Sequence, residues 1–188
     1  MDEKKEKLIK AIKTAVTKYG LSGVSTRNIG DVAQVNDAYI YHFFKDKEDL
    51  LLQAYIYENG IMFNGLINVI DEVHNLPLPI EEKVYICFSK VWRLMLEDPE
   101  RLRFCLFYYH SIHFKNAAEY HQEQLKELSD RTKDYFESEE ICRQTMYSAF
   151  TLFYDSGYSI LNGQEANTEE YQKRIFMMEM AILKSQMK

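Results

Sequence analysis

One stretch near the start of the chain carries side chains whose types and spacing suit contact with nucleic acid. Ser25 is a good N-cap, and the free N–H groups after it, together with the Thr26 hydroxyl, would form an anion site at a helix N-terminus. Arg27 lies next to that end and could form a bidentate pair with guanine or hold a phosphate. Tyr41 and Lys47 could donate hydrogen bonds to phosphate oxygens. The pattern predicts a partner that carries phosphates.

Further candidate residues lie on a predicted short helix from Asp37 to Phe44. Ile40 and Phe44 form its inner side, so the opposite face turns outward. The outward residues are Asp37, Ala38, Tyr39 and His42. Such a face fits the major groove of DNA, which is about 12 Å wide. Because phosphates repel a carboxylate, we expect Asp37 to act in specificity, by accepting from a cytosine amino group or by neutralising Arg27.

Short helices must position these side chains. Apolar residues recur at helical spacing over residues 8–19, and a second short helix follows Ser25. Asn36 is the predicted N-cap of the third helix, and Asp46 caps a long fourth helix that runs to about His74. The first three of these helices, of which the second and third are joined by a tight turn, predict a helix-turn-helix unit.

The segment from Ser25 to Leu50 resembles the DNA-binding head of the TetR family of one-component repressors, and the match covers roughly residues 8–52. The resemblance implies that Thr26, Tyr41 and Lys47 contact the DNA backbone. It also implies that a further set lies at or near base edges, namely Arg27, Asp37, Ala38, Tyr39 and His42.

The segment departs from the family pattern at three places. Gly30 stands where alanine is usual, which lowers helix propensity. Gln34 replaces the turn glycine, so it must accept a left-handed backbone or a different turn at a cost of about 1 kcal/mol. Ala38 and Tyr39 replace the common Gly or Pro and the common Thr or Ser, which makes the surface that would read DNA unusual.

Composition and charge distribution limit the class of protein. The 188 residues include 46% hydrophobic residues, 7 Gly and 3 Pro, so turn chemistry is scarce and sandwiches or barrels are disfavoured. Residues 1–50 carry nine basic and eight acidic side chains, whereas the other 138 carry 14 and 21. A head that tolerates nucleic acid, on an acidic body, agrees with this asymmetry. No apolar run reaches the roughly 20 residues of a membrane span, and no signal-peptide core is present, so we expect no membrane contact and a cytoplasmic location.

The rest of the chain is also predicted to be helical. Residues 75–79 are the one clear linker, and Asp98 and Pro99 mark a stop and a restart. The fold class is therefore all-α, with about nine helices. We expect two domains, a helix-turn-helix DNA-binding domain at residues 1–46 and a ligand-binding and dimerisation domain at residues 47–188.

Aromatic residues, 14% of the chain, are concentrated in this second domain and predict a ligand site. Ligand pockets combine apolar walls with a few polar groups, and the family resemblance implies a small-molecule site in the body. The predicted lining residues are Met62, Phe88, Trp92, Phe104, Tyr108 and Tyr154. They suit a bulky, largely apolar or aromatic effector.

Enzyme and metal chemistry find little support. His110 and His113 could share a helical face with Cys105 one turn back and His121 further on. However, neither Cys-x-x-Cys nor His-Glu-x-x-His is present, and no glycine-rich phosphate loop or nucleophile elbow occurs. We therefore expect no metal, no cofactor and no catalytic residue.

The last two predicted helices, from about residue 139 to 184, have apolar stripes wider than one partner can cover. The small residues Ala149, Ser156 and Gly157 permit close approach, so these helices are expected to pair across a two-fold axis. The sequence thus predicts a homodimeric, ligand-responsive transcriptional regulator, in the first instance a repressor, on a palindromic operator in double-stranded DNA. The alternative is a helical small-molecule sensor or adaptor that acts through protein contacts.

Overall fold

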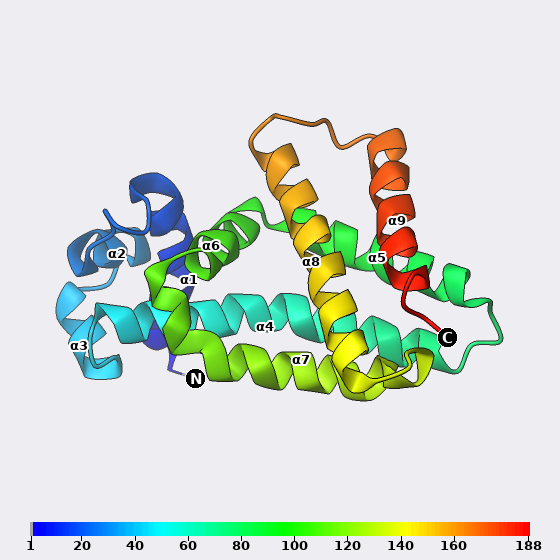
Figure 1. Ribbon diagram of the computed structural model, residues 1–188. Helices are drawn as coiled ribbons and strands as arrows, with labels where there is room; N and C mark the ends of the chain where they lie inside the picture. Colours follow the sequence, from blue (N-terminus) through cyan, green and yellow to red (C-terminus); the bar gives the residue numbers. More distant parts are fainter. Residues whose placement is uncertain (1) are drawn as a thin grey trace. The chain divides into compact units, whose positions relative to one another are not determined.

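The computed structural model describes residues 2–188, which form nine α-helices and three short 3-10 helices (Figure 1). The α-helices are α1 (Glu3–Tyr19), α2 (Thr26–Ala33), α3 (Ile40–Phe43), α4 (Lys47–His74), α5 (Ile80–Glu97), α6 (Pro99–Tyr109), α7 (Ala118–Thr132), α8 (Glu139–Leu161) and α9 (Glu169–Lys184). The 3-10 helices are η1 (Asp37–Tyr39), η2 (Ile112–Ala117) and η3 (Lys133–Tyr135). Within the described residues, β pairing is limited to one isolated bridge between Phe136 and Met187. The all-α prediction is therefore confirmed.

Two compact units make up the chain. The first unit contains residues up to 61 and residues 99–119, so α6 and the first half of α4 belong with α1, α2 and α3. The second unit contains residues 62–98 and 120–188. The predicted functional division at residues 46 and 47 stays a prediction.

Helix α1 begins at Glu3, ahead of the first apolar residue of its stripe. The Asp2 carboxylate accepts a hydrogen bond from the Lys4 N–H at 2.9 Å, which caps the helix. On the inner side, Leu8 and Ile12 are completely buried. Together with other fully buried apolar residues of this unit, they form the core on which α2 and α3 pack.

The turn between α2 and the 37–44 segment relies on two unusual residues. Gln34 has φ 54° and ψ 40°, which is the left-handed backbone that the loss of the turn glycine predicted. A Cβ on Gly30 would lie 2.8 Å from the Val35 carbonyl oxygen. The glycine at position 30 therefore allows the chain to approach α2 closely.

The predicted eight-residue helix at 37–44 is shorter than expected, which corrects the sequence analysis. Asn36 Oδ1 accepts from the Ala38 N–H at 2.8 Å, as predicted for an N-cap, but it closes the 3-10 turn η1. The four-residue helix α3 then follows. Ile40 and Phe44 still face the core, with 0% and 3% exposure. The segment thus buries the face that was predicted, although its helix is shorter than predicted.

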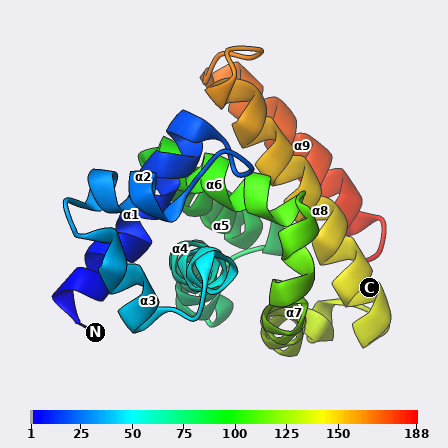
Figure 2. The same ribbon diagram turned by 90° about the vertical axis from the view of Figure 1, so that its left-hand side faces the viewer.

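A buried carboxylate joins three helices of the first unit. Glu58 on α4 is only 1% exposed and accepts a hydrogen bond from Arg101 Nε on α6 at 3.0 Å. Lys13 Nζ on α1 lies 3.4 Å from its other oxygen. The Thr14 hydroxyl also donates to Glu100 at 2.6 Å, so polar contacts connect α1 to α6 at two places. Figure 2 shows α1, α2, α3 and α6 grouped within this unit.

The second unit is built around aromatic packing. Phe88 and Trp92 on α5 stack with ring centroids 5.2 Å apart, and Phe153 on α8 meets the Trp92 ring edge-on at 5.5 Å. Helices α8 and α9 lie side by side and run antiparallel, as Figures 1 and 2 show. One acidic residue of α9 is buried as well, because Glu179 is only 7% exposed, and burial raises its pKa to about 8. Among residues 2–188, no helix is both long enough and apolar enough to cross a lipid bilayer.

Candidate nucleic-acid interface

The outward face of the 37–44 segment is exposed as predicted. Asp37, Ala38 and His42 are exposed, and the exposed fractions of Tyr39 and Tyr41 are 38% and 64%. The burial of Ile40 and Phe44 fixes this orientation, because turning the segment would expose both apolar side chains. The structure therefore brings together every outward residue that the sequence predicted for this segment.

The N-terminus of α2 carries further backbone donors. A capping box is present, in which the Ser25 hydroxyl accepts from the Asn28 N–H at 3.3 Å and Asn28 Oδ1 accepts from the Ser25 N–H at 2.7 Å. In an α-helix the first four N–H groups lack an intrahelical acceptor, so the box leaves those of Thr26 and Arg27 for an external anion. The Ser25 cap is therefore present as predicted, and the anion site after it stays a prediction.

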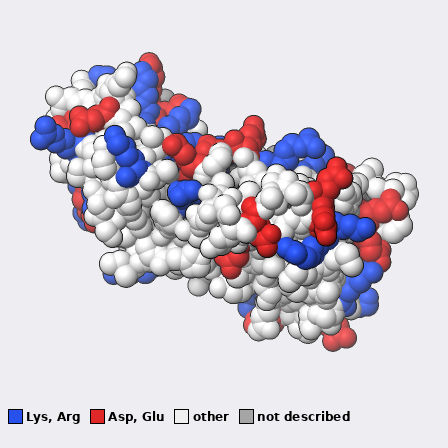
Figure 3. All heavy atoms as spheres, turned by 90° about the horizontal axis from the view of Figure 1, so that it is seen from above, with Lys and Arg blue, Asp and Glu red and all other residues white. Residues whose placement is uncertain are grey.

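The charged candidates differ in how far they are already engaged. Lys47 is half-buried and its ammonium donates to the Val24 carbonyl at 3.3 Å, so only part of its hydrogen-bonding capacity faces outward. Arg27 is exposed. Within residues 2–188, no ion pair joins Arg27 to Asp37, so its predicted neutralisation by Asp37 is absent in the free protein. In the view of Figure 3, basic and acidic side chains are interspersed.

One residue close to this surface escaped the sequence analysis. The Lys4 ammonium lies 3.8 Å from the centroid of the Tyr39 ring. Nothing in the local sequence pattern links the two residues, because α2 and the following turn separate them along the chain. Only the folded arrangement of α1 beside η1 reveals the contact.

Two of the predicted ligand-binding residues belong to the first unit. Phe104 and Tyr108 on α6 are completely buried, and Tyr108 stacks on Tyr55 with ring centroids 4.5 Å apart. The Tyr108 hydroxyl donates to the His113 carbonyl oxygen at 3.2 Å. Burial raises the pKa of this phenol to about 12. The hydroxyl of this predicted lining residue is thus already bonded within the protein.

The other four, Met62, Phe88, Trp92 and Tyr154, belong to the second unit. Met62, Phe88 and Trp92 are buried, whereas Tyr154 is half-buried. The indole N–H of Trp92 donates to Asn167 Oδ1 at 3.2 Å. Packing therefore accounts for the three buried residues, and the pocket predicted from all six stays a prediction.

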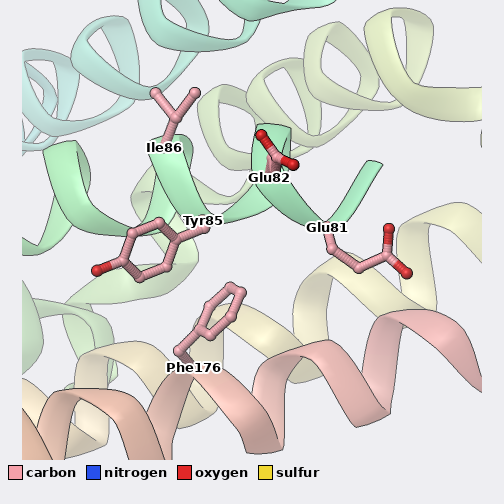
Figure 4. A pocket seen from close by; sticks show the side chains of 5 residues that line it. All are labelled: Glu81, Glu82, Tyr85, Ile86 and Phe176. Carbon is pink, nitrogen blue, oxygen red and sulfur yellow. The ribbon is translucent and has the colours of Figure 1, made fainter. Parts of the chain in front are cut away.

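A different set of residues lines an open pocket on the second unit. Its volume is about 330 Å³, and its lining residues are Glu81, Glu82, Tyr85, Ile86 and Phe176. Figure 4 shows Tyr85 on α5 beside Phe176 on α9, and their ring centroids are 5.1 Å apart. Lys184 pairs with Glu81 at 2.8 Å and thereby lowers the pKa of that carboxyl group. None of the six predicted residues lines this pocket.

The histidines and cysteines form no metal centre in the described part of the chain. Among residues 2–188, no group of three or more His, Cys, Asp or Glu side chains is placed to hold a metal ion. Cys105 is buried and His110 is exposed, while His113 and His121 are half-buried. Desolvation lowers the pKa of His121, which favours its neutral form.

Known proteins resemble this chain in two ways. Residues 5–54 match the sequence model of a family described as bacterial regulatory proteins, tetR family. No curated protein matches the sequence. The fold is similar to that of a TetR family transcription regulator from Marinobacter aquaeolei VT8, with a TM-score of 0.73, 20% identity and coverage of 98% of this chain and 95% of that one.

Two further similar structures contain bound small molecules. The transcriptional regulator FadR from Bacillus subtilis, in complex with stearoyl-CoA, has a TM-score of 0.69 and 16% identity, and the alignment covers 95% of each chain. The multidrug binding protein EbrR, complexed with imidazole, has a TM-score of 0.67 and 14% identity, with 95% of this chain and 96% of that chain covered. At such identities the likeness concerns the fold.

Proposed function

We propose that the protein is a cytoplasmic repressor that binds a palindromic operator as a dimer and is released by a small effector. Residues 5–54 match the model of the tetR family of bacterial regulatory proteins, and the fold is similar to that of a TetR family transcription regulator, which supports this function. The observation that carries the proposal is the exposed 37–44 segment, held outward by the buried Ile40 and Phe44. Thr26, Tyr41 and Lys47 contact phosphates. The remaining predicted residues contact base edges, and they are Arg27, Asp37, Ala38, Tyr39 and His42.

Dimerisation supplies the second half of the recognition surface. One short segment reads too few bases, so two copies about 34 Å apart, or a multiple of that distance, read a palindrome. Ala149, Ser156 and Gly157 are buried within the protomer itself. The large apolar side chains that α8 and α9 leave exposed are Tyr147, Met177 and Met178, and these support pairing through the last two helices.

Release requires only a modest difference in binding free energy. A 100-fold loss of operator affinity corresponds to about 2.7 kcal/mol, which lies in the usual range of allosteric coupling. The effector is largely apolar or aromatic, and the predicted lining residues that belong to the second unit and would contact it are Met62, Phe88, Trp92 and Tyr154. Similar folds that hold stearoyl-CoA and imidazole support a small-molecule site without identifying this ligand. The protein acts by binding, and no residue is assigned a catalytic role.

Selection of bound DNA from a random pool tests the proposal most directly. We expect a palindromic sequence, together with binding that weakens steeply as salt concentration rises, because phosphate contacts release counterions. The competing function is that of a sensor or adaptor acting through protein contacts. Such a protein would show no salt-dependent DNA binding in fluorescence anisotropy, and that result would overturn the proposal.

The effector site has its own test. Candidate apolar compounds are titrated while Trp92 emission is recorded, since this is the only tryptophan in the chain. We expect a change in emission upon binding that also weakens operator affinity. A compound that releases DNA without changing the emission would remove Trp92 from the proposed lining.

A further inference from the structure

The contact between Lys4 and Tyr39 joins the start of α1 to the exposed turn η1. Both side chains are exposed, and the ammonium lies 3.8 Å from the ring centroid. A cation within about 6 Å of an aromatic face is attracted by the negative charge density of the ring. The contact therefore restricts the Tyr39 ring in the free protein.

The first turn of α1 determines where Lys4 lies. Asp2 Oδ1 accepts from the N–H groups of Lys4 at 2.9 Å and Lys5 at 3.4 Å, which fixes the backbone at the helix start. Lys7, one turn later, pairs with Glu3 at 2.8 Å. No acidic side chain among residues 2–188 forms an ion pair with Lys4. The Lys4 charge is thus directed at the tyrosine ring.

The Tyr39 ring has a second aromatic contact. Its centroid lies 6.4 Å from that of Phe43, with an interplanar angle of 20°. Among residues 2–188 no cation lies over the ring of Tyr41, and this is the more exposed of the two side chains, at 64% against 38%. Of the two exposed tyrosines of the 37–44 segment, the structure thus holds Tyr39 and leaves Tyr41 more accessible.

We propose that Lys4 is a positioning residue for sequence recognition, which holds the Tyr39 ring and thereby sets the base edge that the Tyr39 hydroxyl reaches. The proposal rests on the proposed function, in which Tyr39 lies at base edges. It differs from a phosphate contact, because a lysine that only binds phosphate strengthens binding to every sequence equally. Sequence preference is therefore the measurement that distinguishes the two roles.

The experiment uses the full chain and selection from a random DNA pool. Lys4→Met removes the charge but keeps the length of the side chain, and Lys4→Arg keeps a cation that stacks on aromatic faces. Lys7→Met is the matched control, because it removes a lysine of the same helix that pairs with Glu3. Tyr39→Leu removes the ring itself. Unfolding midpoints establish that each variant is folded.

We expect Lys4→Met to relax the preference by about two- to fivefold per half-site, which is the range of an exposed cation–π contact. The relaxation should fall on the operator positions that Tyr39→Leu also affects. The double variant that combines Lys4→Met with Tyr39→Leu should show no more relaxation than Tyr39→Leu alone, because both substitutions remove the same interaction. Lys4→Arg and Lys7→Met should retain the wild-type preference.

Three other results would count against Lys4 as a positioning residue. An equal loss of affinity for all sequences, with the preference intact, would make it a phosphate contact. Additive relaxation in the double variant would mean that Lys4 acts independently of Tyr39. If the wild-type chain selected no sequence at all, the proposed function would fail first, and the role of Lys4 would fail with it.

Discussion

The 37–44 segment of the first unit and the aromatic core between α5 and α8 of the second unit use their aromatic side chains in opposite ways. In the first unit, Tyr39 and Tyr41 stand outward on a segment that Ile40 anchors. In the second unit, Phe88 and Trp92 are buried and contact other rings. Aromatic content alone therefore does not locate a binding surface. What distinguishes the outward rings is a short segment with apolar anchors on its other side.

The largest expected difference concerns the loss of one aromatic ring from each unit. Trp92→Ala should lower the free energy of unfolding by about 3–5 kcal/mol, because it leaves a cavity among the rings of α5 and α8. Tyr41→Ala should change it by less than about 0.5 kcal/mol but weaken DNA binding. Urea denaturation and anisotropy measure the two effects. Equal destabilisation by the two variants would remove the contrast between the units.

Glu58 allows a test of buried charge against surface charge. Glu58→Gln should destabilise the protein by about 3 kcal/mol, because the largely buried Lys13 and Arg101 would lose their carboxylate. Glu72→Gln is the control, since its partner Lys90 and Glu72 itself are both exposed, and it should cost less than about 1 kcal/mol. Similar unfolding midpoints for the two variants would mean that the Glu58 contacts contribute no more than a surface pair.

Glu179 predicts a pH dependence that arises in the second unit. Its pKa is raised to about 8 in the folded state, so the unfolded chain loses this proton at lower pH than the folded one. Stability from this group is therefore complete below about pH 4.5 and declines by about 2–4 kcal/mol as the pH rises to 8. Glu179→Gln should flatten this decline in denaturation measured at several pH values. Glu170→Gln, at an exposed position on the same helix, should leave the decline unchanged.

The smallest expected effects separate phosphate contacts from base contacts within the first unit. Lys47→Ala should weaken binding to all sequences and reduce the slope of log affinity against log salt by about 0.9 per half-site. Arg27→Ala should cost about 1–3 kcal/mol and relax sequence preference, if the guanidinium reads a base. Binding titrations at several salt concentrations, on operator and on unrelated DNA, distinguish the two patterns. An unchanged salt slope for Lys47→Ala would mean that its bond to Val24 accounts for the whole role of its ammonium.

Local signals in the sequence predicted local structure well. Ser25, Asn36 and Asp46 act as caps, and Gln34 adopts the left-handed backbone, which was one of the two alternatives predicted for it. The form of the 37–44 segment was less predictable, because the Asn36 bond closes a 3-10 turn before the chain enters α3. Hydrophobic periodicity identifies which face is buried, and it leaves open how tightly a short helix winds.

Contacts between distant residues could not be predicted in the same way. Periodicity indicated that Phe104 and Trp92 are buried, but it does not specify the partner of either ring. In the structure the two residues belong to separate units. The cation over Tyr39 escaped prediction for the same reason, since Lys4 reads locally as one of several surface lysines.

A substitution at Gln34 could raise the thermal stability of the protein. A non-glycine residue in the left-handed region carries a penalty of about 1 kcal/mol that glycine avoids. Because the close approach to α2 depends on Gly30, which lies within that helix, an exchange at position 34 would leave the packing of α2 untouched. A laboratory that needs a sturdier form of this protein would therefore begin with Gln34→Gly.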